Sequence, residues 1–109
     1  MRFKIDAAAP LKITGIRPEL VAALMVAQRV FDDLGADFVV TSCAEHSAAH
    51  SNASLHYAGS AFDCRIHHML IKHHAEAVKM LKERLTDEFD VVLEKDHIHV
   101  EFQPKRIRA

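Results

Sequence analysis

The chain has 109 residues, of which 50% are hydrophobic and 27% charged. This length predicts a single domain, residues 1–109, with one modest core. The formal net charge of −1 gives no electrostatic basis for binding nucleic acid or an anionic membrane, and no apolar run approaches the ~20 residues that span a bilayer.

The first half of the chain predicts one helix and one strand. Residues 1–10 contain only a short apolar run, which is not typical of a signal peptide, so we expect a protein made in the cytoplasm without one. Residues 17–34 predict a helix, with Pro18 in the first turn, apolar residues at helical spacing and Gly35 as a stop signal. Residues 37–42 predict a strand that is covered on both faces.

The second half predicts three strands and another helix. Residues 61–66 alternate between apolar and polar, residues 68–85 carry an apolar helical stripe, and residues 88–94 and 97–102 predict a β-hairpin. Together these elements predict an α+β fold, with a small, mostly antiparallel sheet and two helices on one of its faces.

His56 and Asp63 lie seven positions apart in the sequence, with a glycine between them. A fully extended chain of that length would place them ~23 Å apart, whereas two ligands of one zinc ion each lie ~2 Å from the metal. The chain must therefore fold back between them, and Gly59 is the residue that tolerates such a turn. After the turn, Asp63 lies on a strand, on the face opposite Phe62 and Cys64.

The last predicted strand has the same two-faced character. His97, His99 and Glu101 lie on one face, and the three residues that alternate with them are apolar. Glu94 comes just before this strand. Two imidazoles and a nearby carboxylate are the groups that a catalytic zinc site requires.

Two motifs together carry a resemblance to a known family. The first is SLHYAGSAFDCR at residues 54–65, and the second is the His-x-His strand at residues 97–99. The combination resembles the zinc peptidases of the D-Ala-D-Ala carboxypeptidase and L-alanyl-D-glutamate endopeptidase family, which share a fold with the signalling domain of Hedgehog. The likeness is strongest to small phage-type members, whose motif reads Ser-Leu-His-Tyr-x-Gly-x-Ala-x-Asp-x-Arg, and it covers roughly residues 18–102.

The resemblance implies a zinc site and its residues. His56, Asp63 and one histidine of the last strand would bind Zn²⁺ and leave one position open. Some family members place the third ligand three residues after the catalytic glutamate, which would select His97, whereas others use the second histidine of His-x-His. The alternating strand matches the latter, so we predict His99 as the ligand. Glu94 is then the general base, and His97 a hydrogen-bond donor to the substrate or the developing oxyanion.

The function implied by the resemblance is hydrolysis of peptide bonds in peptidoglycan stem or cross-link peptides, as in cell-wall degradation by phage endolysins. We expect a monomeric metallopeptidase that acts at the cell wall. Two alternatives remain open, namely a non-catalytic zinc-binding interaction module and a phage structural component with the same fold.

One departure from the family affects the substrate prediction. Many relatives carry an arginine before the first motif that grips the terminal carboxylate of the substrate, but residues 42–46 contain none. This favours an endopeptidase over a carboxypeptidase. Arg65 could supply the missing cation, and Glu45 and His50 are predicted to line the substrate cleft.

Overall fold

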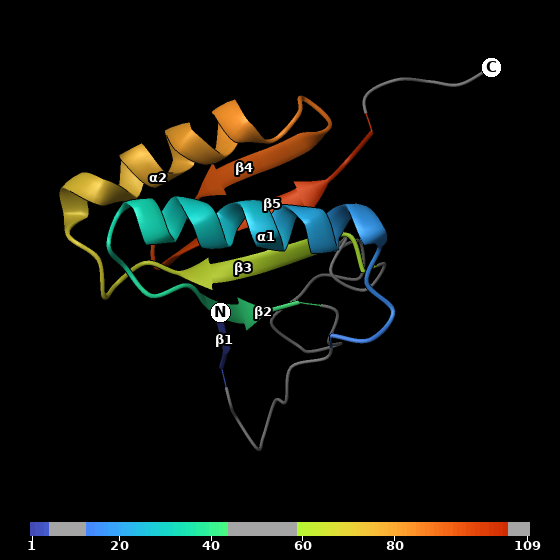
Figure 1. Ribbon diagram of the computed structural model, residues 1–109, viewed down its shortest axis with the longest axis horizontal. Coiled ribbons are helices and arrows are strands. Elements are labelled where there is room, and N and C mark those ends of the chain that lie inside the picture. The colour runs from blue at the N-terminus through green and yellow to red at the C-terminus, as the bar shows by residue number, and fades with distance from the viewer. Residues whose placement is uncertain (5–12, 44–58, 105–109) are drawn as a thin grey trace.

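The computed structural model describes residues 1–4, 13–43 and 59–104, which form an α+β fold (Figure 1). The elements in chain order are β1 (Arg2–Phe3), α1 (Pro18–Asp33), β2 (Val39–Ser42), β3 (Ala61–Arg65), α2 (Ile71–Arg84), β4 (Phe89–Leu93) and β5 (His97–Phe102). The sheet has the strand order β1-β2-β3-β5-β4, in which β1 runs parallel to β2 and the other neighbours are antiparallel. The predicted α+β class and mostly antiparallel sheet are confirmed.

Helix α1 forms where the sequence predicts it. Pro18 stands in the first turn, where a backbone N–H has no partner within the helix, and Glu19 complements the positive end of the helix dipole. Beyond the last turn, Gly35 adopts a φ of 69°, a conformation that favours glycine. The face turned to the core consists of Leu20, Ala23, Leu24, Ala27, Val30 and Phe31.

The two faces of the sheet differ because side chains alternate along each strand. One face joins the helices in a single buried cluster, to which β3 and β5 contribute Phe62, Cys64, Ile98 and Val100. The intervening positions, which include Asp63 and His99, point to the other face. The helices therefore cover the apolar face, and the predicted site residues of β3 and β5 share the opposite one.

Helix α2 begins three residues later than predicted, at Ile71 instead of His68. The preceding residues form a turn in which the Met69 N–H donates to the carbonyl of Ile66 (2.9 Å), and the Met69 side chain is buried in the core. The Nε2 atom of His74 is hydrogen-bonded to the same carbonyl (2.9 Å). Tertiary burial of Met69 thus prevails over the helical tendency of this stretch.

Strand β1 is not predicted from the sequence. The Arg2 N–H donates to the carbonyl of Phe38, and the Lys4 N–H donates to that of Val40, each over 2.8 Å. Two residues are too few to show any periodicity. Their pairing makes β2 an interior strand, and Phe38, Val39 and Val40 are all buried, as predicted for a strand covered on both faces.

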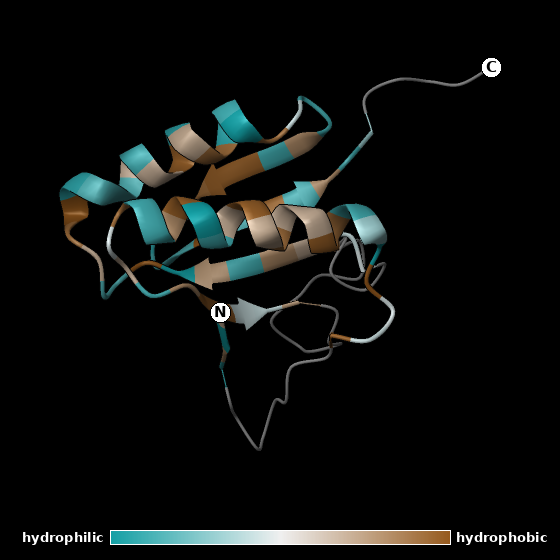
Figure 2. Ribbon diagram, in the orientation of Figure 1, coloured by the Kyte–Doolittle hydropathy of each residue, from teal (hydrophilic) through white to brown (hydrophobic). Residues whose placement is uncertain are grey.

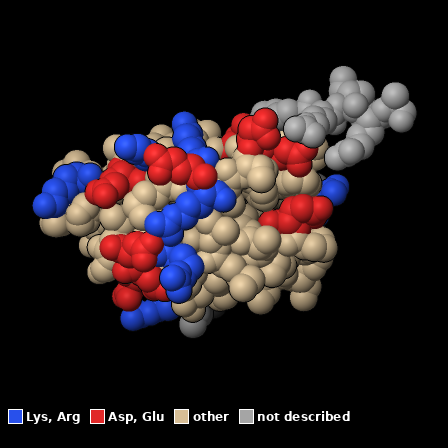
Figure 3. Space-filling model, turned by 45° about the horizontal axis from the view of Figure 1, so that its top comes forward, with Lys and Arg blue, Asp and Glu red and all other residues tan. Residues whose placement is uncertain are grey.

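The surface shows no segregation of charge on the face in view. Acidic and basic side chains are interspersed there (Figure 3), in line with the net charge of −1. Hydrophobic residues lie along much of β4, whereas both helices carry a mixture (Figure 2). Neither of the described helices combines the length and the apolar character that crossing a bilayer requires.

Candidate functional site

The structure describes five of the eight predicted site residues. These are Asp63, Arg65, Glu94, His97 and His99. The other three, Glu45, His50 and His56, lie outside the described residues, so the roles assigned to them stay predictions.

Asp63 and His99 meet directly across two strands. β3 and β5 pair antiparallel with Asp63 opposite His99, which puts both side chains on the same face of the sheet. The Asp63 Oδ1 atom lies 2.8 Å from the His99 Nδ1 atom. Their side chains are 12% and 20% exposed, so water is largely but not fully excluded from the pair. The sequence predicts this proximity through a shared metal, and the strand register now places the two residues side by side.

His97 joins this pair from the next position on the same face. Its Nε2 atom lies 3.7 Å from Oδ2 of Asp63, which is beyond hydrogen-bond distance. Its Nδ1 atom is hydrogen-bonded to Oδ1 of Asp96 (2.6 Å), and this bond holds the pKa of Asp96 below its ordinary value. Asp96 thereby orients the His97 ring with Nε2 towards Asp63. Arg65 lies opposite His97 in the register and shares this face.

Glu94 lies at the hairpin end of the same face. Its backbone N–H donates to the carbonyl of His97 (2.9 Å), which extends the β4–β5 pairing beyond Leu93 and Ile98. Glu94 therefore stands across from His97, and its side chain is exposed. Within the described part of the chain its carboxylate forms no ion pair, so it is placed near the cluster without being bound to it.

Glu101 is a member of the cluster that the sequence analysis leaves without a role. Its Oε1 atom lies 2.7 Å from the Nε2 atom of His99, and both side chains are about one-fifth exposed. The spacing of two residues on a strand already places Glu101 on the His99 face. That spacing is the signal that could have identified it.

Two carboxylates therefore flank the His99 imidazole. The hydrogen bond with Asp63 is the largest influence on His99 and raises its pKa to about 9, against the opposing effect of burial, while Glu101 adds to the rise. Without a metal, His99 is thus protonated at neutral pH. A metal ion that bound here would displace that proton.

Asp63 and His99 are two of the three predicted zinc ligands, and the structure places their side chains next to each other. Zinc in proteins prefers histidine nitrogen and carboxylate oxygen, which are the groups that Asp63 and His99 bring together. Within residues 1–4, 13–43 and 59–104, no three His, Cys, Asp or Glu side chains are grouped so that they could hold one metal ion. A complete site therefore needs a ligand from elsewhere, and the predicted one is His56.

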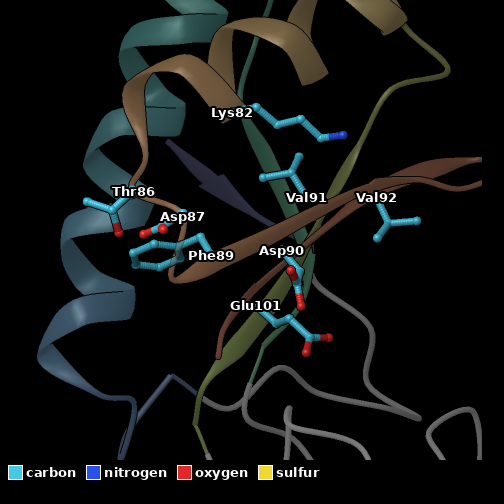
Figure 4. Close-up of a pocket in the computed structure, with 8 residues that line it drawn as sticks. All are labelled: Lys82, Thr86, Asp87, Phe89, Asp90, Val91, Val92 and Glu101. Atoms are coloured by element: carbon cyan, nitrogen blue, oxygen red, sulfur yellow. The ribbon is translucent and has the colours of Figure 1, made fainter. Parts of the chain in front are cut away.

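A shallow pocket of about 350 Å³ lies beside this cluster, at the free edge of β4 (Figure 4). Of the cluster residues, Glu101 alone lines it. The lining residues are Lys82, Thr86, Asp87, Phe89, Asp90, Val91, Val92 and Glu101. The pocket thus reaches Glu101 and does not contain the predicted zinc ligands that the structure describes.

Comparison with known proteins assigns no family to the chain. No protein-family model matches it, and a search of curated proteins finds no significant match.

Proposed function

We propose that this protein is a zinc-dependent peptidase that hydrolyses peptide bonds in peptidoglycan stem or cross-link peptides. The observation that carries the proposal is the cross-strand pair of Asp63 and His99, whose carboxylate and imidazole lie 2.8 Å apart on the sheet face away from the helices. The His-x6-Asp and His-x-His motifs predict a ligand role for these same two residues. The specific Hedgehog-like arrangement of the fold is part of the proposal.

Asp63 and His99 would hold the zinc ion together with His56. When bound, zinc supplies Lewis-acid chemistry, since it polarises a scissile carbonyl and lowers the pKa of water. The sheet fixes the two described ligands on neighbouring strands, so little conformational entropy is lost when they bind. Of the two candidates on β5, His99 is favoured because it is the histidine directly opposite Asp63.

Glu94 and His97 would perform the proton transfer and the charge stabilisation. Glu94, exposed at the hairpin end of the site face, takes a proton from the attacking water and passes it to the leaving amine. His97 donates a hydrogen bond to the carbonyl oxygen as negative charge develops there. Asp96 holds the His97 ring by its Nδ1 atom and so directs Nε2 towards the site.

Arg65 is the described residue best placed to bind a carboxylate of the substrate. It lies on the site face opposite His97, and it forms no ion pair within the described ranges. An endopeptidase depends less on binding a terminal carboxylate than a carboxypeptidase does. Mapping the released fragments by mass spectrometry would identify the bond that is cut.

Substitution of Glu94 by glutamine tests the proposed mechanism. We expect Glu94→Gln to bind zinc with wild-type stoichiometry, because Glu94 is not a ligand, while hydrolysis falls about 10²–10⁴-fold through loss of the base. The measurements are zinc content by elemental analysis and release of free amines from purified peptidoglycan fragments. Glu83→Gln, which removes the same charge from an exposed position on α2, is the matched control and should leave both unchanged.

The same two measurements on the wild-type chain separate the alternatives. Zinc binding with amine release supports the peptidase. Zinc binding without release indicates a non-catalytic interaction module, and absence of both indicates a structural component. Full hydrolysis by Glu94→Gln would exclude Glu94 as the base.

A further inference from the structure

We propose that Glu101 is a positioning residue that fixes the ring of His99 through Nε2, so that Nδ1 is the nitrogen presented beside Asp63. The proposal rests on the proposed zinc site for its consequence, but the ring orientation itself does not require a metal. The starting observation is that His99 has a carboxylate at each ring nitrogen, with Asp63 2.8 Å from Nδ1 and Glu101 2.7 Å from Nε2.

The two carboxylates are not equivalent, because their second oxygens have different surroundings. The side-chain amide of Gln103 lies between two carboxylates, and with its nitrogen turned towards them it donates to Oε2 of Glu101 (3.0 Å) and to Oδ2 of Asp90 (2.7 Å). Both oxygens of Glu101 are therefore engaged in hydrogen bonds. The second oxygen of Asp63 faces another imidazole, that of His97, at 3.7 Å. Asp63 thus belongs to the cluster of metal-binding groups, and Glu101 belongs to a hydrogen-bonded support behind it.

The support is anchored on the sheet. Asp90 of β4 stands opposite Glu101 of β5 in the register, and Figure 4 shows the two side chains next to each other on adjacent strands. Gln103 follows β5, and its N–H donates to the carbonyl of Glu88 (2.7 Å). His99, Glu101 and Asp90 lie on paired strands, and Gln103 is held by its backbone hydrogen bond. The side chains of this support are therefore all fixed through the backbone of the sheet.

The chemical consequence follows from the imidazole. A neutral ring carries one N–H and one lone pair, and the hydrogen bond at one nitrogen decides which nitrogen can bind a metal. Glu101 accepts from Nε2–H and so favours the tautomer whose lone pair lies on Nδ1, whereas Asp63 favours the opposite one. Without Glu101, the ring can instead donate Nδ1–H to Asp63 and turn its lone pair away. Loss of such a supporting carboxylate typically lowers metal affinity about 10–100-fold.

The experiment compares the wild-type chain with Glu101→Ala, Glu101→Gln and the matched control Glu83→Ala. Zinc affinity is measured by competition with a chromophoric chelator. Histidine ¹⁵N NMR of the zinc-free chain, at a pH at which the rings are neutral, identifies the tautomer of His99. We expect a larger share of the Nε2–H tautomer in the wild type than in Glu101→Ala, a 10–100-fold weaker affinity in Glu101→Ala, and no change in Glu83→Ala. Glu101→Gln keeps an acceptor oxygen and should lie between.

The outcomes separate this proposal from the proposed function. If the wild type binds and uses zinc while Glu101→Ala keeps the tautomer and the affinity, Glu101 has no positioning role and the peptidase stands. If the wild type does not bind zinc, the peptidase fails, and the zinc-free tautomer still decides whether Glu101 orients His99. Should Glu101→Ala not fold, Gln103→Ala removes the donor that holds Glu101 and must shift the tautomer in the same direction.

Discussion

His99 shows how the environment of one side chain sets its protonation. Its neighbour in sequence on the same face, Glu101, and its cross-strand neighbour, Asp63, are both carboxylates. Each favours the protonated ring, and together they outweigh the burial that favours the neutral one. The His99 ring therefore keeps both of its protons at neutral pH.

This protonation predicts a pH dependence of stability for the zinc-free chain. The folded-state pKa of His99 is about 9 against an ordinary value of 6.5, so its contribution is fully present below pH 6.5 and is lost as the pH rises through 9. We expect the urea concentration at the midpoint of unfolding of the chelator-treated chain to decrease as the pH is raised from 7 to 10. His99→Gln should flatten this part of the profile. Identical profiles for the two chains would contradict the assignment.

A contact between the loop before β3 and the loop before α1 positions the start of β3. Gly59 precedes the strand with a φ of 70°, and its carbonyl accepts a hydrogen bond from the Arg17 N–H (2.9 Å) at the beginning of α1. A Cβ atom at this position would lie 2.4 Å from the Gly15 carbonyl oxygen. The close approach of the two backbones therefore ties the strand that carries Asp63 to the first helix.

Two glycine substitutions measure this contact. Gly35→Ala meets no atom within 4 Å, so it should lose only the about 1–2 kcal/mol that a left-handed backbone costs a non-glycine residue. Gly59→Ala has the same backbone strain together with the collision, and we expect it to lose roughly 3 kcal/mol or more. Urea unfolding of both variants gives the comparison. Equal losses would show that the loops separate without penalty.

The described part of the molecule is held together by an apolar cluster between the sheet and the helices. Phe38 is central to it, with its ring centroid 5.2 Å from that of Phe31 on α1 and 6.0 Å from that of Phe62 on β3. Asp63 follows Phe62 directly and points the other way. The packing of Phe62 in the core therefore helps to fix the position of Asp63 on the opposite face of the sheet.

Truncation of this aromatic residue should affect the entire domain. Phe38 is 1% exposed, and Phe38→Ala is expected to lower the free energy of unfolding by about 3–5 kcal/mol, a large part of the roughly 5–15 kcal/mol typical of a domain. Ile71→Ala, at a position that is 84% exposed, is the control and should change stability by less than ~0.5 kcal/mol. Thermal and urea unfolding provide the measurement. A loss at Phe38 no larger than that at Ile71 would contradict the central role of this ring.

Much of the fold could be predicted because periodicity reports burial. Strand β5 has the predicted bounds, residues 97–102, since three apolar and three polar residues alternate along it. The predicted start of α2 is wrong, because Met69 is buried by contacts with distant residues that the local pattern does not reveal. β1 was missed because two residues carry no period. The roles of His56, His50 and Glu45 stay predictions.

Which residues share a face of a strand could be predicted from the sequence, because side-chain alternation along a strand is a local property. The sequence placed Asp63 on one strand and His97, His99 and Glu101 on another, each opposite an apolar face. Which of these residues touch could not be predicted, because strand order and register depend on packing between segments far apart in the chain. That register sets Asp63 against His99 rather than His97, and it brings Asp90 beside Glu101.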